Sequence, residues 1–454
     1  MPHSSIVHDL RSAHSADALL TGAPLPTLLY FALPIILGNI FQQLYSIVDA
    51  IVVGNFLGDL PLSGISVASP IVDVANALVI GGTIGVGVLC AHYCGAGEGE
   101  RLRCMNATAL LGGGALTLLI ALCGIFFSTP LLRAQGTEEA VCREAAVYLQ
   151  LVFAGLLFCF LYNYYAAMLR SCGNSRTPFL ILLLSSTLHA LLDVLFVGVF
   201  GWGIRGVAFS TVLCQALAAA ACILYAQRRC PPLLLRPANL RFDRQMARLV
   251  LSYAWAAALQ QAVVCIGRLL VQGMLTPLGT STVTGYNMSL RTEQFLFCFS
   301  QGISAAMVVC LSQNLGHGDR PRARRFFRIS VLVELALIAL LGTVCFLFPA
   351  RIVGLFSDNA DVIAAGAQYT GAMAYLYVFA YLGEVIQGFF RGLGRLRLTM
   401  VASLLQVLLR VVLSYLLIPV WGMYGICAAV VSGWVLLVGI EGAYAVRKSS
   451  ALAA

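Results

Sequence analysis

HYCGAGEGERLR at residues 92–103 recurs half a chain length later as SQNLGHGDRPRAR at 312–324. Two glycines and two arginines match between the segments at one constant offset in residue number, 221: Gly95 with Gly316, Gly97 with Gly318, Arg101 with Arg322 and Arg103 with Arg324. An ordered set of matches at one offset indicates an internal duplication. The chain is therefore expected to contain two copies of one structural unit.

Further matches extend this duplication toward both ends of the chain. LRSCGNSR at 169–176 matches FRGLGRLR at 390–397 at the same offset. Trp202 and Trp421 match at an offset of 219, and the pairs at 42–43 and 260–261, both Gln-Gln, match at 218. The offset changes very little along the chain, so almost the whole chain belongs to the repeat.

The composition indicates that lipid surrounds the protein. Of 454 residues, 60% are apolar and 10% are charged, with a mean hydropathy of +0.90, whereas soluble domains are about one quarter charged. Apolar runs of about 20 residues are needed to cross a bilayer, and we expect twelve: 27–54, 63–91, 104–128, 142–168, 178–200, 206–227, 249–275, 282–312, 329–348, 362–390, 398–419 and 424–446.

The expected fold is an all-α integral membrane protein of 12 transmembrane helices in two parallel six-helix repeats. Six spans per copy return the chain to its starting side, so both copies have the same orientation. The predicted divisions are a cytoplasmic tail at 1–26, an N-terminal lobe at 27–227, a cytoplasmic linker at 228–248, a C-terminal lobe at 249–446 and a cytoplasmic tail at 447–454.

Basic residues predict the orientation of the chain. Most of the 28 Lys and Arg residues lie in the tails and the even-numbered loops, and the odd-numbered loops hold Arg133, Arg143, Arg205 and Arg351. This asymmetry is typical of cytoplasmic loops, so both termini are expected in the cytoplasm of a multi-pass plasma-membrane protein. The net charge of +9 then reflects topology, and no nucleic-acid partner is expected.

The fifteen cysteines are expected to behave as small buried apolar residues. Most lie inside apolar runs, where a free cysteine packs much like a small hydrophobic side chain. Their odd number also argues against a complete set of disulfides.

Polar side chains gather in spans of the N-terminal half, where each needs a partner or a function because burial in lipid is costly. Asn39, Gln42, Ser46 and Asp49 form a stripe on one face of the first span, and His189 and Asp193 share a face of the fifth. Asn163 and Thr211 add polar groups from the fourth and sixth. Such a set suits a small cation or a proton; the alternative is a network that only fixes helix packing.

The C-terminal half carries charges of both signs within its spans. They are Arg268, Arg291, Glu293, Glu384 and Arg410. Mutual neutralisation and contact with a substrate both account for them. Glu334 and Glu441 are expected to be structural.

Several motifs together resemble those of the multidrug and toxic compound extrusion (MATE) family of the MOP superfamily. They are LPIILGNIFQQLYSIVDAIVVGNFLG at 33–58, LRSCGNSRTPF at 169–179, its echo FRGLGRLRLTM at 390–400, and SQNLGHGD at 312–319. The resemblance implies an antiporter that exports bulky, often cationic organic compounds in exchange for H⁺ or Na⁺. It implies no cofactor beyond the coupling ion.

The resemblance also implies a cation site in the N-terminal lobe. Its acids correspond to Asp49 and Asp193, which would bind Na⁺ if that is the coupling ion, and its hydroxyl corresponds to Thr211. His189 replaces the asparagine expected one turn before the second acid. Histidine side chains gain or lose a proton near neutral pH and asparagine does not, so this replacement favours H⁺.

The substrate cavity is expected to include polar side chains of both halves: Asn39, Gln42, Gln43, Gln260, Gln261, Arg268, Glu293 and Glu384. Expected partners are small organic molecules and membrane lipids, and a monomer is expected. The alternatives are a lipid or lipid-linked oligosaccharide flippase of the same superfamily and an intramembrane enzyme. HExxH and GxSxG motifs are absent from the sequence, which disfavours the enzyme.

Overall fold

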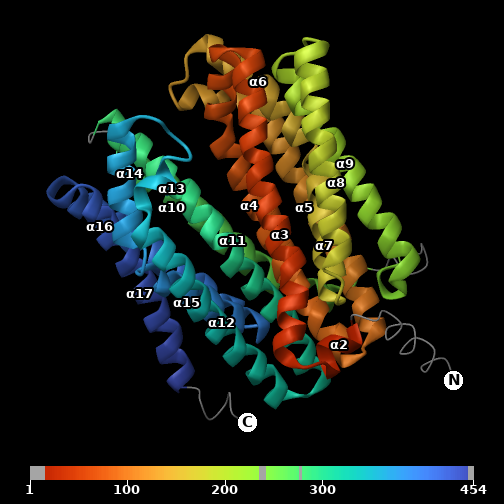
Figure 1. Ribbon diagram of the computed structural model, residues 1–454. Coiled ribbons are helices and arrows are strands. Elements are labelled where there is room, and N and C mark those ends of the chain that lie inside the picture. Colours follow the sequence, from red (N-terminus) through yellow and green to blue (C-terminus); the bar gives the residue numbers. More distant parts are fainter. Residues whose placement is uncertain (1–15, 235–241, 276–278, 448–454) are drawn as a thin grey trace. The chain divides into compact units, whose positions relative to one another are not determined.

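The computed structural model describes residues 16–234, 242–275 and 279–447, and all regular elements in these ranges are helical (Figure 1). Residues 1–15 and 448–454 of the predicted tails and 235–241 of the predicted linker lie outside the described residues. Within the described ranges, ten helices are long and apolar enough to cross a membrane, or twelve if each of two bent helix pairs counts as one span. This agrees with the predicted twelve spans.

The chain divides into two compact units. The first contains Leu33–Ala262, Ser312–Gly318 and the described residues up to Gly22; the second contains Ala23–Ala32, Val263–Leu311 and the chain from Asp319 onward. The long helices α3 (Pro24–Leu57), α10 (Arg244–Gly273) and α11 (Thr280–His317) each contribute to both units.

The remaining helices belong to one unit each. The first unit has α2 (Ala16–Thr21), α4 (Asp59–Ala96), α5 (Gly99–Ala134), α6 (Glu139–Ala154), α7 (Leu156–Ser171), α8 (Arg176–Asp193), a π-helix at Val194–Val199, α9 (Ile204–Arg229) and a 3₁₀ turn at Pro231–Leu233. The second has α12 (Arg320–Leu347), α13 (Pro349–Val353), α14 (Ala360–Met373), α15 (Tyr377–Gly392), α16 (Leu396–Trp421) and α17 (Met423–Arg447).

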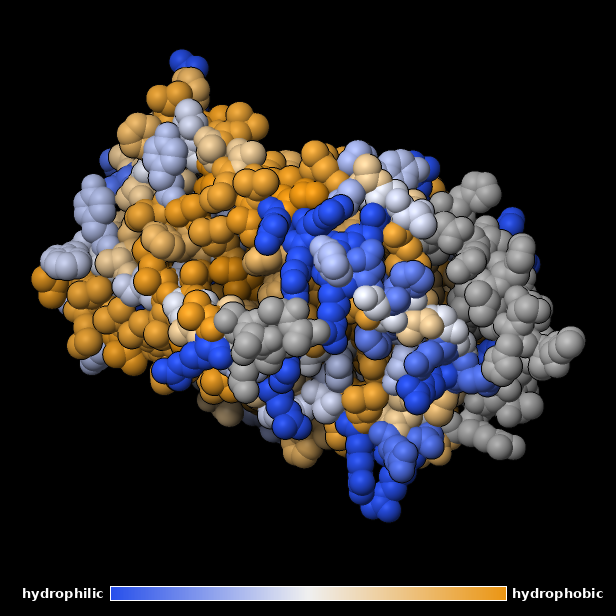
Figure 2. Space-filling model, turned by 90° about the horizontal axis from the view of Figure 1, so that it is seen from below, coloured by the Kyte–Doolittle hydropathy of each residue, from blue (hydrophilic) through white to orange (hydrophobic). Residues whose placement is uncertain are grey.

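Each unit has its own apolar core. In the first, α4 packs against α6 and α7, and α9 packs against α7 and α8, around buried side chains such as Tyr164 and Met168. In the second, α16 packs against α17 and α15 against α12, around side chains such as Tyr369 and Met373. Large hydrophobic side chains such as Phe126 are also exposed, and hydrophobic residues cover much of the surface in Figure 2. Such a surface is stable against lipid rather than water.

Two predicted spans are broken, which corrects the expectation of continuous helices over 142–168 and 362–390. α6 and α7 meet at an angle of 45° at Gly155, and α14 and α15 at 58°. Gly155 and Leu376, the residues before α7 and α15, are related by the same offset of 221 as the repeated motifs, so the break belongs to the repeated unit. At Gly155 a Cβ would overlap the side chain of Val212 on α9, so glycine permits the close approach of α9.

The fifth predicted span, 178–200, changes its winding partway along. It is α-helical to Asp193 and continues as a π-helix from Val194 to Val199. In the second unit, α16 remains α-helical throughout. π-Helical turns are rare and are frequent at functional sites.

Candidate cation site

The buried polar centre of the first unit is built by three helices. α8 supplies His189 and Asp193, α9 supplies Ser210 and Thr211, and α3 supplies Tyr45. His189 and Asp193 are one helical turn apart, so both side chains project from the same face of α8. Asp193 has 0% exposed surface and His189 has 3%.

The two oxygens of Asp193 have different surroundings. Oδ1 is hydrogen-bonded to Ser210 Oγ, whose single proton also faces the Val207 carbonyl at 2.8 Å. Oδ2 lies 2.8 Å from Nδ1 of His189 but forms no hydrogen bond of normal geometry with the described residues. The contact with His189 is therefore mainly electrostatic.

Both ring nitrogens of His189 are in contact with polar groups. Nε2 is 2.9 Å from Thr211 Oγ1. The Tyr45 hydroxyl lies 2.7 Å from Nδ1 and 3.0 Å from Nε2, and the two rings pack edge to face with centroids 4.9 Å apart. Tyr45 thereby connects α3 to the imidazole.

The hydroxyl groups of the polar centre limit where its protons can be. Thr211 Oγ1 donates its only proton to the Val207 carbonyl at 2.9 Å, because a carbonyl can only accept. His189 Nε2 must then carry a proton to donate to Thr211. A neutral imidazole would direct its Nδ1 lone pair toward a carboxylate oxygen, which is repulsive. One further proton, on Nδ1 or on the carboxyl group of Asp193, makes the contact favourable.

The chain matches a known protein family in both of its halves. The family model described as MatE matches residues 34–195 and, a second time, residues 256–416. The chain belongs to the MATE family. The repeated match agrees with the duplication found in the sequence.

Individual relatives support the same assignment. The chain is 27% identical over 387 residues to "Probable multidrug resistance protein YpnP" of Bacillus subtilis, covering 85% of this chain and 86% of that one. It is 26% identical over 355 residues to the "FAD transporter" of Shewanella oneidensis, covering 76% and 77%. A MOP superfamily transporter from Pyrococcus furiosus has the same fold, with a TM-score of 0.90, 18% identity and coverage of 98% and 100%.

The protein is therefore a multi-pass membrane protein with the general role of a MATE transporter. Its fold class and its family were both predicted correctly from the sequence.

The structure brings together three of the five residues predicted for cation coupling in this MATE protein. Asp193, His189 and Thr211 are in contact. Asn163 instead donates hydrogen bonds to the carbonyl and the sulfur of Cys159. Asp49 belongs to α3, but its side chain lies outside the described residues. The coupling role of all five stays a prediction.

Two members of the polar centre, Tyr45 and Ser210, were not predicted. Tyr45 lies four residues before Asp49 and therefore on the same face of α3, so helical spacing could have indicated it. Ser210 adjoins Thr211 in the sequence, but only the packing of α9 against α8 shows that it reaches Asp193.

The predicted substrate residues of this MATE protein are distributed over both units. In the first unit, Asn39, Gln42 and Gln43 lie on α3, and Gln260 and Gln261 lie on α10. In the second, Arg268 lies on α10, Glu293 on α11 and Glu384 on α15. Their contact with substrate stays a prediction.

Charges in the second unit are partly compensated. Glu293 is buried, and its Oε2 accepts hydrogen bonds from Tyr369 at 3.4 Å and Tyr377 at 3.3 Å. Glu384 forms an ion pair with Arg391 on the same helix, at 3.3 Å.

Two further acids of the second unit are buried more completely. Glu334 on α12 and Glu441 on α17 have 0% exposed surface. None of their carboxyl oxygens forms a hydrogen bond with the described residues. A carboxyl group in such surroundings is much more stable neutral than ionised.

Proposed function

We propose that this MATE protein is a secondary antiporter that exports bulky, often cationic organic compounds across the plasma membrane by alternating access. The coupling ion enters as the compound leaves. Of the two candidate ions, H⁺ and Na⁺, the proposal favours H⁺.

The observation that carries the proposal is the contact between His189 and Asp193. These two ionisable groups are almost fully buried, with Nδ1 and Oδ2 2.8 Å apart. Because this contact is favourable with one added proton and repulsive without it, the pair is suited to bind and release a proton. Hard cations such as Na⁺ prefer oxygen ligands, and at this position His189 offers an imidazole nitrogen instead.

Tyr45 offers a route from proton binding to helix movement. Its hydroxyl lies within 3.0 Å of both ring nitrogens, while the Nδ1 position itself faces Asp193, so Tyr45 experiences the change in charge of the imidazole directly. Loss of the proton thus changes both the interaction of Tyr45 with the imidazole and the interaction of His189 with Asp193. α3 carries Tyr45, so its packing against α8 depends on the proton.

Coupling requires that proton and exported compound favour opposite conformational states. In the outward-open state, protonation of the His189–Asp193 pair would alter the packing of α3 and lower affinity for the compound. In the inward-open state, proton release would restore that affinity. Each cycle then exchanges one species for the other.

The test is uptake of a fluorescent cationic dye into proteoliposomes with either a pH gradient or a Na⁺ gradient imposed. Asp193→Asn keeps the side-chain size and removes ionisation, so we expect uptake driven by the pH gradient to fall by about tenfold or more. Asp358→Asn, at an exposed acid between α13 and α14, should leave uptake unchanged. Unaltered proton-driven uptake by Asp193→Asn would rule out this site, and uptake driven only by Na⁺ would rule out H⁺.

A second candidate substrate class is anionic. The Shewanella oneidensis relative is named as an FAD transporter, and the second unit places Arg268 within an apolar helix, where a guanidinium favours a negatively charged partner. FAD and the cationic dye should be compared as competitors in the same vesicles. Competition by FAD but not by organic cations would favour the anionic class.

A further inference from the structure

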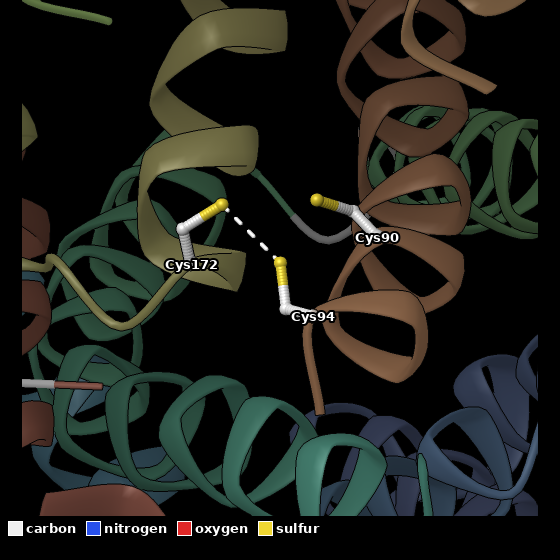
Figure 3. A group of neighbouring side chains, drawn as sticks. All are labelled: Cys90, Cys94 and Cys172. Atoms are coloured by element: carbon white, nitrogen blue, oxygen red, sulfur yellow. Dashed lines mark hydrogen bonds between the residues drawn. The ribbon is translucent and has the colours of Figure 1, made fainter. Parts of the chain in front are cut away.

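Three cysteine thiols converge inside the first unit, away from the polar centre. Cys90 and Cys94 lie one turn apart on α4, and Cys172 directly follows α7 (Figure 3). The three sulfur atoms all lie within 4.8 Å of one another, and those of Cys94 and Cys172 are 3.3 Å apart. Cys90 is fully buried and the other two are partly buried.

The surrounding backbone fixes this geometry. The Ser171 hydroxyl donates to the Gly87 carbonyl at 2.8 Å and so ties the end of α7 to α4. Cys172 is followed by Gly173, whose φ of +91° is accessible mainly to glycine and turns the chain sharply. The thiols are thus held together by contacts that do not involve the sulfurs.

The internal duplication provides a comparison within the same chain. The offset of 221 relates Gly95 to Gly316 and Gly173 to Gly394. At the same offset, the three cysteine positions correspond to leucines in the second copy: Leu311, Leu315 and Leu393. The second copy therefore packs this region with ordinary apolar side chains. The first copy has thiols at all three positions, and packing alone does not require three thiols.

A fourth sulfur is available nearby. Cys230, just after α9, packs against the same group of buried side chains, although it is not part of the group of three whose sulfurs lie within 4.8 Å of one another. Metal cations bind the thiolate form, so binding at this sulfur would displace the thiol proton.

We propose that Cys90, Cys94 and Cys172 form a three-thiolate site for a d¹⁰ metal cation, Zn²⁺ or Cu⁺, in which Cys230 could complete the ligand set only after moving closer. With metal–sulfur bonds of about 2.3 Å, the sulfurs of a tetrahedral site stand about 3.8 Å apart, which lies between the 3.3 Å that separates Cys94 from Cys172 and the 4.8 Å limit of the whole cluster. Thiolates are the ligands that these soft and borderline cations prefer. Binding would release the thiol protons and connect α4 to the end of α7.

The proposal is tested on the full-length protein, purified in detergent, reduced and freed of metal with a chelator. Titration with Co²⁺ should produce the absorption of tetrahedral thiolate-bound cobalt at one equivalent per chain, with release of protons. Zn²⁺ should then abolish this absorption. Titration with Cu⁺ against a coloured Cu⁺ chelator separates the copper case from the zinc case.

Matched variants identify the ligands. Replacement of Cys90, Cys94 and Cys172 by leucine copies the second repeat, keeps the region apolar, and should abolish binding. Serine at Cys310, Cys345 and Cys427, three buried cysteines of the second unit, should leave binding unchanged. If the leucine variant does not fold, Cys94→Ser alone should lower the affinity at least tenfold, because one thiolate is lost.

Three results would overturn the proposal. The first is the absence of the thiolate–cobalt absorption in the parent protein. The second is unchanged binding in the folded triple-leucine variant or in Cys94→Ser. The third is a mass lower by two hydrogens, which would report a Cys94–Cys172 disulfide in the purified protein.

Discussion

At position 189 this MATE protein has a histidine where the family resemblance implied an asparagine. The substitution matters because the imidazole contacts Asp193, Thr211 and Tyr45 at once. An amide in its place could bond with Thr211 but could not carry the additional proton. The chemistry of the polar centre therefore differs from that of a purely oxygen-lined cation site.

His189→Asn is expected to flatten the pH dependence of transport near neutral pH. Histidine is the residue type whose charge changes in that range, and asparagine does not ionise. The measurement is the initial rate of dye uptake as the outer and inner pH are varied together at a fixed gradient. A parallel series with His317→Asn, at the end of α11, controls for general effects of losing a histidine. An unchanged profile for His189→Asn would argue against a role of this side chain in proton coupling.

Glu334 is a fully buried acid of the second unit. Its carboxyl oxygens form no hydrogen bond of normal geometry with the described residues, although the Ser300 hydroxyl lies close to them, so replacement by an apolar side chain of similar size should stabilise the fold. We expect Glu334→Leu to raise the free energy of unfolding by about 1–3 kcal/mol, measured by thermal unfolding in detergent. Glu334→Gln retains a buried polar group and should give no such gain. Destabilisation by Glu334→Leu would indicate that the acid has a partner within the folded protein.

Among the helices, the bent pairs α6–α7 and α14–α15 are the clearest departure from the predicted spans. Both breaks occur at the same position of the repeat, so they are a feature of the repeated unit. The π-helix after Asp193 occurs in the first copy only. The break in the helix pair is therefore common to both copies, whereas the π-helix lies beside the polar centre that only the first copy contains among the described residues.

Gly155→Ala tests whether glycine is needed at the break of the fourth span so that α9 can pack closely against it. The added Cβ would overlap Val212 on α9, and overpacking of this kind costs about 1–3 kcal/mol. Thermal unfolding in detergent measures the loss. Gly112→Ala is the matched control, because a Cβ there meets no atom within 4 Å and alanine favours a helix by about 1 kcal/mol. Equal stability of the two variants would contradict the packing explanation.

For the molecule as a whole, the distribution of basic residues predicts the orientation in the membrane. Alkaline phosphatase, which is active only outside the cytoplasm, should be inactive when fused to the C-terminus and active when inserted at residues 135–138 between α5 and α6. Green fluorescent protein should show the opposite pattern at these two positions. The reverse result would invert the topology and place the Arg-rich loops outside, against the positive-inside rule.

The sequence alone determined the membrane environment, the number of spans and the duplication. These properties are local or periodic: the length of an apolar run decides whether a segment crosses lipid, and matched residues at a constant offset reveal a repeat. It also indicated Asp193 and His189, because burying an ionisable group in lipid costs free energy and therefore requires a partner or a function. Thr211 was indicated as a polar side chain of the next span.

Only the tertiary structure decided which side chains meet. Tyr45 reaches His189 across 144 positions of the chain, and Cys94 reaches Cys172 across 78, so helical spacing could not pair them. The cysteines in particular were expected to act as isolated apolar residues, and their convergence was not predicted. Contacts between distant segments depend on how helices pack, and packing is decided by the shapes of all the surrounding side chains at once.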